Sequence, residues 1–349
     1  MEFATYILIY FCALYFIITP FVYNEKYIFI LWISISMMLS VAIRTKIDLM
    51  ADSDIANYAS FMQVDEIPFF FYREFIFFFG SKYLYDLIGN AISVFVVIDF
   101  IFYILLFNGI VLIREGFFLK VKSHYINYFY FAILIFFPFV LGAHTTLRQL
   151  FATVLFINTF GYIGNKKYLK GIIIFLISIF VHNSMLYFLP ILLFTIRKPI
   201  TKTLSVIMLL LIVLINSNIT TISSELLIRD YTTNVEGYKI TLMYIYSLLS
   251  ILLFVVMMEV LHRKVTKIFF SWIVLMLLII YFSAVSSFSS GISQRVAFLV
   301  YSFLFPILAF YIETIFKQKK LTRIIFLHIS ILPLIFVHNS TIDLTPLFK

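Results

Sequence analysis

The sequence predicts an all-α polytopic membrane protein that forms one integral membrane domain over residues 1–349. Apolar residues make up 63% of the chain and charged residues 12%, whereas soluble domains have roughly 45–50% and about 25%. No soluble core of this size can bury so much apolar surface, so the solvent must be lipid. The basic residues, with a net charge of +9, fall in small groups between apolar runs, which indicates topology signals rather than a nucleic-acid-binding face.

Apolar runs long enough to cross a bilayer recur along the whole chain and predict about twelve transmembrane segments, including one broken hairpin. The complete runs are 4–23, 27–43, 84–113, 125–142, 147–163, 204–218, 239–261, 268–288, 296–316 and 324–338. The first run has no basic residues before it and no cleavage site after it, so we expect no cleavable signal peptide.

The orientation of the chain follows from its lysines and arginines, which gather in alternate loops. One set of loops contains 17 of the 26 basic residues and is predicted to be cytoplasmic, with both termini outside. The two sets alternate only if 171–196 enters and leaves the membrane on one side. Its two pieces of about 12 residues each reach about 18 Å, too short for a full crossing. We therefore expect a broken hairpin at 171–196, with His182-Asn183-Ser184 at its tip.

Two long polar segments are expected on the exported side. The loop 44–82 contains a short apolar stretch, 69–80, that is interrupted by Arg73-Glu74 and fits an interfacial or re-entrant helix. This helix either lines an entrance for lipid chains or only anchors the loop. The second exported loop is 219–238.

The exported side also has five arginines, although basic residues are disfavoured there. Arginine provides a planar fork that binds phosphate or carboxylate at two points. The alternative is pairing with the many acids of the same loops or with lipid headgroups. Because the five recur at helix ends facing one compartment, we expect them to bind an anion; they are Arg44, Arg73, Arg148, Arg229 and Arg295.

Arg148 and Gln149 stand at the start of a span after the tight turn that contains His144. The helix dipole and free amide groups there add to the charge of the arginine, which predicts an anion site. His182 lies within an apolar stretch, where it is either a hydrogen-bonded structural residue or a group that donates to phosphate or exchanges a proton. For Asp99, in mid-span, a hydrogen-bonded structural role is favoured.

Several chemistries find little or no support in the sequence. Asp52-Ser-Asp54 could hold a divalent cation through oxygen ligands, but a solvated loop or a supporting role is the stronger interpretation. The lone Cys12 excludes a disulfide framework. Phosphate-binding loops, zinc-protease motifs, serine-hydrolase motifs and dinucleotide fingerprints do not occur. We therefore expect no cofactor and no metal.

Short motifs in a fixed order along most of the chain resemble the EpsG/O-antigen polymerase (Wzy-type) family of bacterial polysaccharide polymerases. In this sequence they are Arg44, Asp54-x-x-x-Tyr58, Arg73-Glu74-Phe75, Leu147-Arg148-Gln149, Gly164-Asn-Lys-Lys-Tyr-Leu, Phe180-Val-His182-Asn-Ser184 and Gln294-Arg295. One departure concerns the Glu-Pro pair usual in the family, which is split here into Glu66-Ile-Pro68 and Arg73-Glu74.

The resemblance implies a GT-C-like glycosyltransferase of the bacterial inner membrane whose active site faces the periplasm. Such enzymes transfer a growing glycan from undecaprenyl pyrophosphate to a new lipid-linked oligosaccharide. The implied partners are these lipid-linked donors and acceptors and the bilayer, with a chain-length regulator protein as a further candidate. Nucleic acid is not an expected partner.

The residue types fit that chemistry, which needs cations over the leaving diphosphate and a base for the acceptor hydroxyl. Arg148 and Arg295 are the main candidates for the first task, and Asp54, Glu74 and His182 compete for the second. The other candidate substrate-binding residues are Arg44, Tyr58, Arg73, Gln149 and Arg229. Alternatives are another lipid-linked-sugar glycosyltransferase that uses a metal at Asp52 and Asp54, an O-antigen ligase, or a flippase for the same lipid-linked units.

Overall fold

The fold is known from a computed structural model that describes residues 2–19, 24–46, 54–64, 72, 74–119, 121–144, 146–226, 235–261, 269–286, 290–316 and 319–336. All regular secondary structure in these ranges is helical, with fifteen α-helices, which confirms the predicted all-α class. The chain divides into two compact units, Met1–Asn183 with Phe305–Lys349, and Ser184–Leu304. We call them the first and the second unit.

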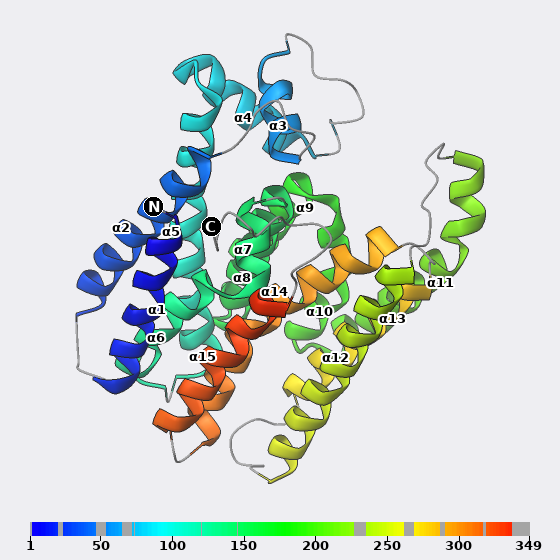
Figure 1. Cartoon of the computed structure of the whole chain (residues 1–349). Coiled ribbons are helices and arrows are strands. Elements are labelled where there is room, and N and C mark those ends of the chain that lie inside the picture. The colour runs from blue at the N-terminus through cyan, green and yellow to red at the C-terminus, as the bar shows by residue number, and fades with distance from the viewer. Residues whose placement is uncertain are drawn as a thin grey trace. The chain divides into compact units, whose positions relative to one another are not determined.

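The first unit contains the charged residues that the sequence singles out before residue 184. Its helices are α1 (Glu2–Ile18), α2 (Glu25–Arg44), α3 (Asp54–Met62), α4 (Phe75–Ile88), α5 (Ala91–Phe117), α6 (Asn127–Leu134), α7 (Phe137–His144), α8 (Leu147–Gly164), α9 (Tyr168–Val181), the end of α14 (Ser290–Ile315), and α15 (Lys319–Phe336). The short 3-10 helix η2 (Ser123–Ile126) precedes α6. Helix α2 packs against both α1 and α5, so the three lie alongside one another (Figure 1).

The second unit is also helical. It comprises most of the 3-10 helix η3 (Asn183–Phe188), then α10 (Leu189–Thr195), α11 (Pro199–Leu226), α12 (Val235–Leu261), α13 (Phe269–Ser286) and the first part of α14. Helix α13 packs against α10, α11 and α12. Glu259 of α12 accepts backbone hydrogen bonds from Phe270 and Ser271, at 3.0 and 3.2 Å, and so caps the start of α13.

Helices α5 and α8 form a close-packed pair, with its tightest contacts in the second half of α8. A Cβ atom added to Gly161 would lie 2.6 Å from the Leu112 Cβ, and one added to Gly164 would lie 2.4 Å from the Phe117 ring, so only glycine permits this approach. Asn158 donates to the Leu105 carbonyl oxygen at 2.7 Å, which adds a polar tie between the helices. The pair therefore fixes the second half of α8 against α5.

Four helical stretches of the described residues are long and apolar enough to cross a membrane, and a fifth crossing results if the α6–α7 pair, bent by 55°, counts as one. The four are Glu25–Arg44, Ala91–Phe117, Pro199–Asn216 and Arg295–Ile315. The chain is thus a multi-pass membrane protein. Five further apolar helices have 10–17 residues, so the predicted total of about twelve crossings and the GT-C-like arrangement remain predictions.

The short helix predicted at 69–80 differs in its boundaries from the structure. Helix α4 runs from Phe75 to Ile88 and ends at Gly89, whose φ of 74° is the left-handed conformation that glycine adopts without strain. Asn90 then caps α5 by accepting from the Ser93 amide at 3.0 Å. The sequence placed the start of this span at residue 84 because 84–88 are largely apolar, but the Gly-Asn pair begins a new helix.

The predicted break in 171–196 coincides with an interruption of the helix. Helix α9 ends at Val181, and His182 has an extended backbone with φ of −154° and ψ of 118°. Because the boundary between the two units follows Asn183, the return of this segment to one side of the membrane remains a prediction.

Candidate functional site: an ion pair between aromatic rings

The candidate site is centred on an ion pair in the first unit between Glu74 and Arg148. Glu74 is the residue before α4 and is 3% exposed, and its Oε2 atom accepts a hydrogen bond from Arg148 Nη1. Its other oxygen, Oε1, accepts from the backbone N–H of Asn183 at 3.3 Å and lies 3.7 Å from Nδ1 of His182. Three segments far apart in the sequence therefore meet at one carboxylate.

Two aromatic rings that are nearly perpendicular to each other lie beside the guanidinium of Arg148. Its Cζ atom lies 4.7 Å from the centroid of the Tyr58 ring and 4.8 Å from that of Phe78. Both distances are within the range of cation–π attraction. Tyr58 is buried and packs edge-on against Phe77, with ring centroids 5.4 Å apart, so this ring beside the guanidinium is itself held in place.

The Arg148 side chain still has capacity to bind an anion. It is 20% exposed, and its buried Nε atom makes no hydrogen bond to any residue that the structure describes. Arg148 lies in the first turn of α8, and Thr146, the residue before the helix, makes no side-chain cap. The first amide groups of the helix thus add partial positive charge beside the guanidinium.

Gln149 follows Arg148 in the first turn of α8, but its side chain is 2% exposed. The sequence predicts that it binds substrate from the start of the helix. Its burial favours support of the helix start rather than contact with a bulky ligand, and its substrate-binding role remains a prediction.

Arg44, the last residue of α2, is placed differently from the sequence prediction. It is completely buried and donates to both carboxylate oxygens of Asp99, each at 2.8 Å, and to the Ala143 carbonyl oxygen at 2.8 Å. Ser40 donates to the same carboxylate at 2.6 Å. Asp99 has the hydrogen-bonded role that the sequence favours, whereas a direct contact of Arg44 with substrate gains no support, because no ligand reaches a fully buried guanidinium.

A second polar cluster lies beside the end of α7. Glu2 accepts from Lys46 Nζ at 3.1 Å, and its Oε1 atom lies 3.0 Å from Nε2 of His144. Burial alone raises the pKa of the Glu2 carboxyl, but the hydrogen bonds and charges of His144 and Lys46 outweigh burial and lower the pKa below its ordinary value. The first-unit charges therefore form ion pairs on both sides of the α7–α8 turn.

The remaining candidates lie outside the described side chains or in the second unit. Asp54 begins α3, one turn before Tyr58, but its side chain is outside the described residues, as are Asp52, Arg73 and Arg229. Arg295 is exposed on α14 and belongs to the second unit. No group of three or more metal-binding side chains occurs in the part of the chain that the structure describes.

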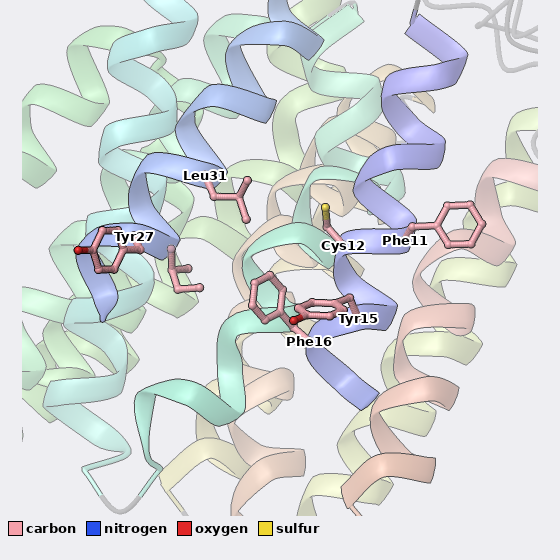
Figure 2. Close-up of a pocket in the computed structure, with 7 residues that line it drawn as sticks. Phe11, Cys12, Tyr15, Phe16, Tyr27 and Leu31 are labelled. Atoms are coloured by element: carbon pink, nitrogen blue, oxygen red, sulfur yellow. The ribbon is translucent and has the colours of Figure 1, made fainter. Parts of the chain in front are cut away.

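The cavity between α1 and α2 is separate from the charged residues. It has a volume of about 470 Å³ and is lined by Phe11, Cys12, Tyr15, Phe16, Tyr27, Ile28 and Leu31. Figure 2 shows these side chains extending from the two helices. Its apolar lining lacks the charged groups that diphosphate chemistry needs.

Sequence reasoning missed two contributors to the site. Phe78 was one of many phenylalanines of an apolar helix, and nothing in its sequence position distinguishes it as a partner of Arg148. The backbone N–H of Asn183 contacts Glu74 only because α9 ends at the preceding residues. The sequence signal for this contact was the polar triplet 182–184, which predicts a break in the helix at this point.

The fold and the site define a class: a multi-pass α-helical membrane protein with a charged site at the start of one helix. The model of the EpsG family matches residues 29–347. The chain therefore belongs to the EpsG family, whose members are membrane proteins associated with polysaccharide biosynthesis. No curated protein and no solved structure matches the chain.

Proposed function

We propose that the chain is a polysaccharide polymerase of the bacterial inner membrane. It transfers a growing glycan from undecaprenyl pyrophosphate to a new lipid-linked repeat unit at the periplasmic face. The observation that carries the proposal is the convergence of Arg148, Glu74 and His182 at the start of α8 in a member of the EpsG family.

The proposed reaction breaks the bond between the anomeric carbon of the glycan and the diphosphate oxygen. A hydroxyl oxygen of the acceptor sugar forms the new bond to that carbon and loses its proton to a base. Undecaprenyl pyrophosphate leaves with the electron pair. Catalysis therefore needs positive charge at the leaving oxygens and a base at the acceptor hydroxyl.

Arg148 is the proposed group for the leaving diphosphate. Its guanidinium lies beside the rings of Tyr58 and Phe78, and an arginine fork matches the geometry of phosphate oxygens. In the absence of substrate Glu74 accepts from this fork. A diphosphate competes with Glu74 for the N–H groups of Arg148. Binding of the lipid-linked glycan donor therefore releases the Glu74 carboxylate from Arg148.

Glu74 is the base that the geometry favours. Once Arg148 contacts the diphosphate, Glu74 keeps the Asn183 amide and His182 as neighbours, at 3.3 and 3.7 Å, and gains capacity to accept a proton. His182 then relays or shares that proton. Asp54 remains the competing base, because it precedes Tyr58 by one helical turn.

The exposed face of α4 supports a lipid-linked substrate. Phe75, Phe79 and Tyr83 are 41%, 38% and 66% exposed on the helix that Glu74 precedes. In a membrane protein, such apolar side chains contact lipid at little cost. A polyprenyl chain lying along α4 would bring its diphosphate to the Glu74–Arg148 pair.

A deletion strain tests the proposed reaction. A polymerase mutant makes one-unit glycans and accumulates the lipid-linked unit on the periplasmic side, and Arg148→Ala reproduces this phenotype at normal protein levels. Cytoplasmic accumulation would instead identify a flippase, and a full-length polymer left on its lipid carrier would identify a ligase. The matched control is Arg114→Ala, which removes the arginine of another partly buried ion pair, with Glu25, and retains polymerisation.

A further inference from the structure

The end of α7, which precedes Arg148 in the sequence, is held by charged groups from other helices. Arg44 of α2 donates to the Ala143 carbonyl oxygen at 2.8 Å, near the end of α7. The same guanidinium is fixed by two hydrogen bonds to Asp99 of α5, so Ala143 is tied to two helices through one fully buried side chain.

His144, the last residue of α7, contacts a different charged group. His144 Nε2 lies 3.0 Å from Glu2 of α1, whose other oxygen accepts from Lys46 at the end of α2. The Glu2 side chain is 4% exposed. The last two residues of α7, 143 and 144, are thus anchored by separate clusters, and Arg148 follows four residues after the second anchor.

The energetic cost of these clusters argues that they have a purpose other than stability. A buried ion pair often contributes no more to stability than apolar residues of the same volume, because both charges lose their hydration. Geometry is what such a pair provides: an arginine fork binds a carboxylate and a carbonyl oxygen in fixed directions.

We propose that Arg44, fixed by Asp99, is a positioning residue that sets the end of α7 and thereby the place of the Arg148 guanidinium. This inference rests on the proposed function of Arg148 and deepens it. Arg44 contacts no substrate and acts only through Ala143. A second anchor, the contact of Glu2 with His144, fixes the same end of α7. A displacement of Arg148 by about 1 Å is enough to cost roughly a hundredfold in rate.

The test compares Arg44→Lys with a matched control, Arg323→Lys. Arg323 is also buried and donates to both carboxylate oxygens of Glu313, at 2.6 and 2.7 Å. Its guanidinium lies over the rings of Tyr125, just before α6, and Tyr128, within α6, and not at the end of α7. Lysine keeps the charge in both cases, but one ammonium cannot hold the carboxylate and the Ala143 carbonyl in the same directions.

The expected result is a selective loss of turnover. Arg44→Lys lowers kcat at least tenfold with little change in KM for the lipid-linked donor, and amide hydrogen exchange rises in the peptide covering the start of α8. Arg323→Lys lowers the melting temperature by a comparable amount but changes neither kcat nor exchange in that peptide. Equal kcat for Arg44→Lys and the wild type, or an equal loss in both variants, would overturn the positioning role.

Two further variants distinguish a failure of the positioning role from a failure of the proposed function. If Arg44→Lys fails to accumulate, His144→Gln tests the second anchor, with the same expected rise in exchange and a smaller loss of kcat; unchanged exchange and kcat would overturn the inference. Arg148→Ala tests the proposed function itself: full activity of Arg148→Ala refutes that function, whereas an inactive Arg148→Ala beside a fully active Arg44→Lys refutes only the positioning.

Discussion

Replacing Glu74 by glutamine separates the two roles proposed for this carboxylate. Glutamine has nearly the same shape and keeps one oxygen that can accept from Arg148, but it has no charge and cannot act as a base. The account therefore predicts opposite effects on binding and on turnover. Glu74→Gln binds undecaprenyl pyrophosphate more tightly than the wild type does and transfers glycan far more slowly.

The size of both effects follows from the structure. One hydrogen bond joins the charged Glu74 and Arg148 side chains, and such bonds contribute about 1.5–3 kcal/mol. Glutamine keeps a neutral hydrogen bond of about 0.5–1.5 kcal/mol, so Glu74→Gln weakens the competition for the 20% exposed Arg148 side chain by about 1 kcal/mol, which is about fivefold in Kd. Loss of a general base lowers the rate by roughly 10²–10⁴-fold.

The assay measures both quantities on one preparation in nanodiscs. The Kd is determined with undecaprenyl pyrophosphate, and kcat with the lipid-linked repeat unit. Glu25→Gln, which removes the carboxylate partner of Arg114, is the control and changes neither quantity. Unchanged or weaker binding by Glu74→Gln would refute the competition for Arg148, and wild-type turnover would refute Glu74 as the base.

Two further predictions concern metal and pH. Polymerisation in membranes survives chelation of divalent cations by EDTA, because arginine neutralises the diphosphate; a loss that Mg²⁺ or Mn²⁺ restores would assign the reaction to a metal at Asp52 and Asp54. The second concerns Glu2, whose pKa is lowered from the ordinary value of 4.5. Its charged form stabilises the fold above that value, and the contribution is lost as the pH falls through the lowered pKa. The melting temperature of the wild type should therefore exceed that of Glu2→Gln at neutral pH and converge with it in acid; a constant difference would contradict this.

The sequence was sufficient to predict the helical class, because 63% apolar composition with recurring long runs permits no soluble fold. It was less informative about where helices end. Gly89 and Asn90 separate α4 from α5 inside a region whose apolar residues continue on both sides, and hydropathy averaged over a span does not detect two residues.

Several site residues were predictable individually, each from a different signal. His182 is an ionisable residue in an apolar stretch, Arg148 is an exported arginine at a helix start, and Glu74 belongs to a motif of the family resemblance; the structure brings them together. Their meeting was not predictable, since it depends on how α4, α8 and α9 pack.

Arg44 shows the limit of interpreting an arginine by its position alone. Its place at a helix end on the exported side resembled that of Arg148, yet its partner is Asp99, 55 residues away in the sequence. The sequence signal for this pairing was Asp99 itself, because a carboxylate in the middle of a span requires a cation or several hydrogen-bond donors.

The transfer reaction of the purified protein tests the central claim most directly. Protein reconstituted with a lipid-linked repeat unit should produce glycans of increasing length and release undecaprenyl pyrophosphate. Arg148→Ala should be reduced roughly 10²–10³-fold, as expected for loss of one charge-assisted contact at a developing charge. Arg148→Lys should be strongly impaired, and Arg114→Ala should match the wild type. Equal product ladders from Arg148→Ala and the wild type at equal protein levels would contradict the account.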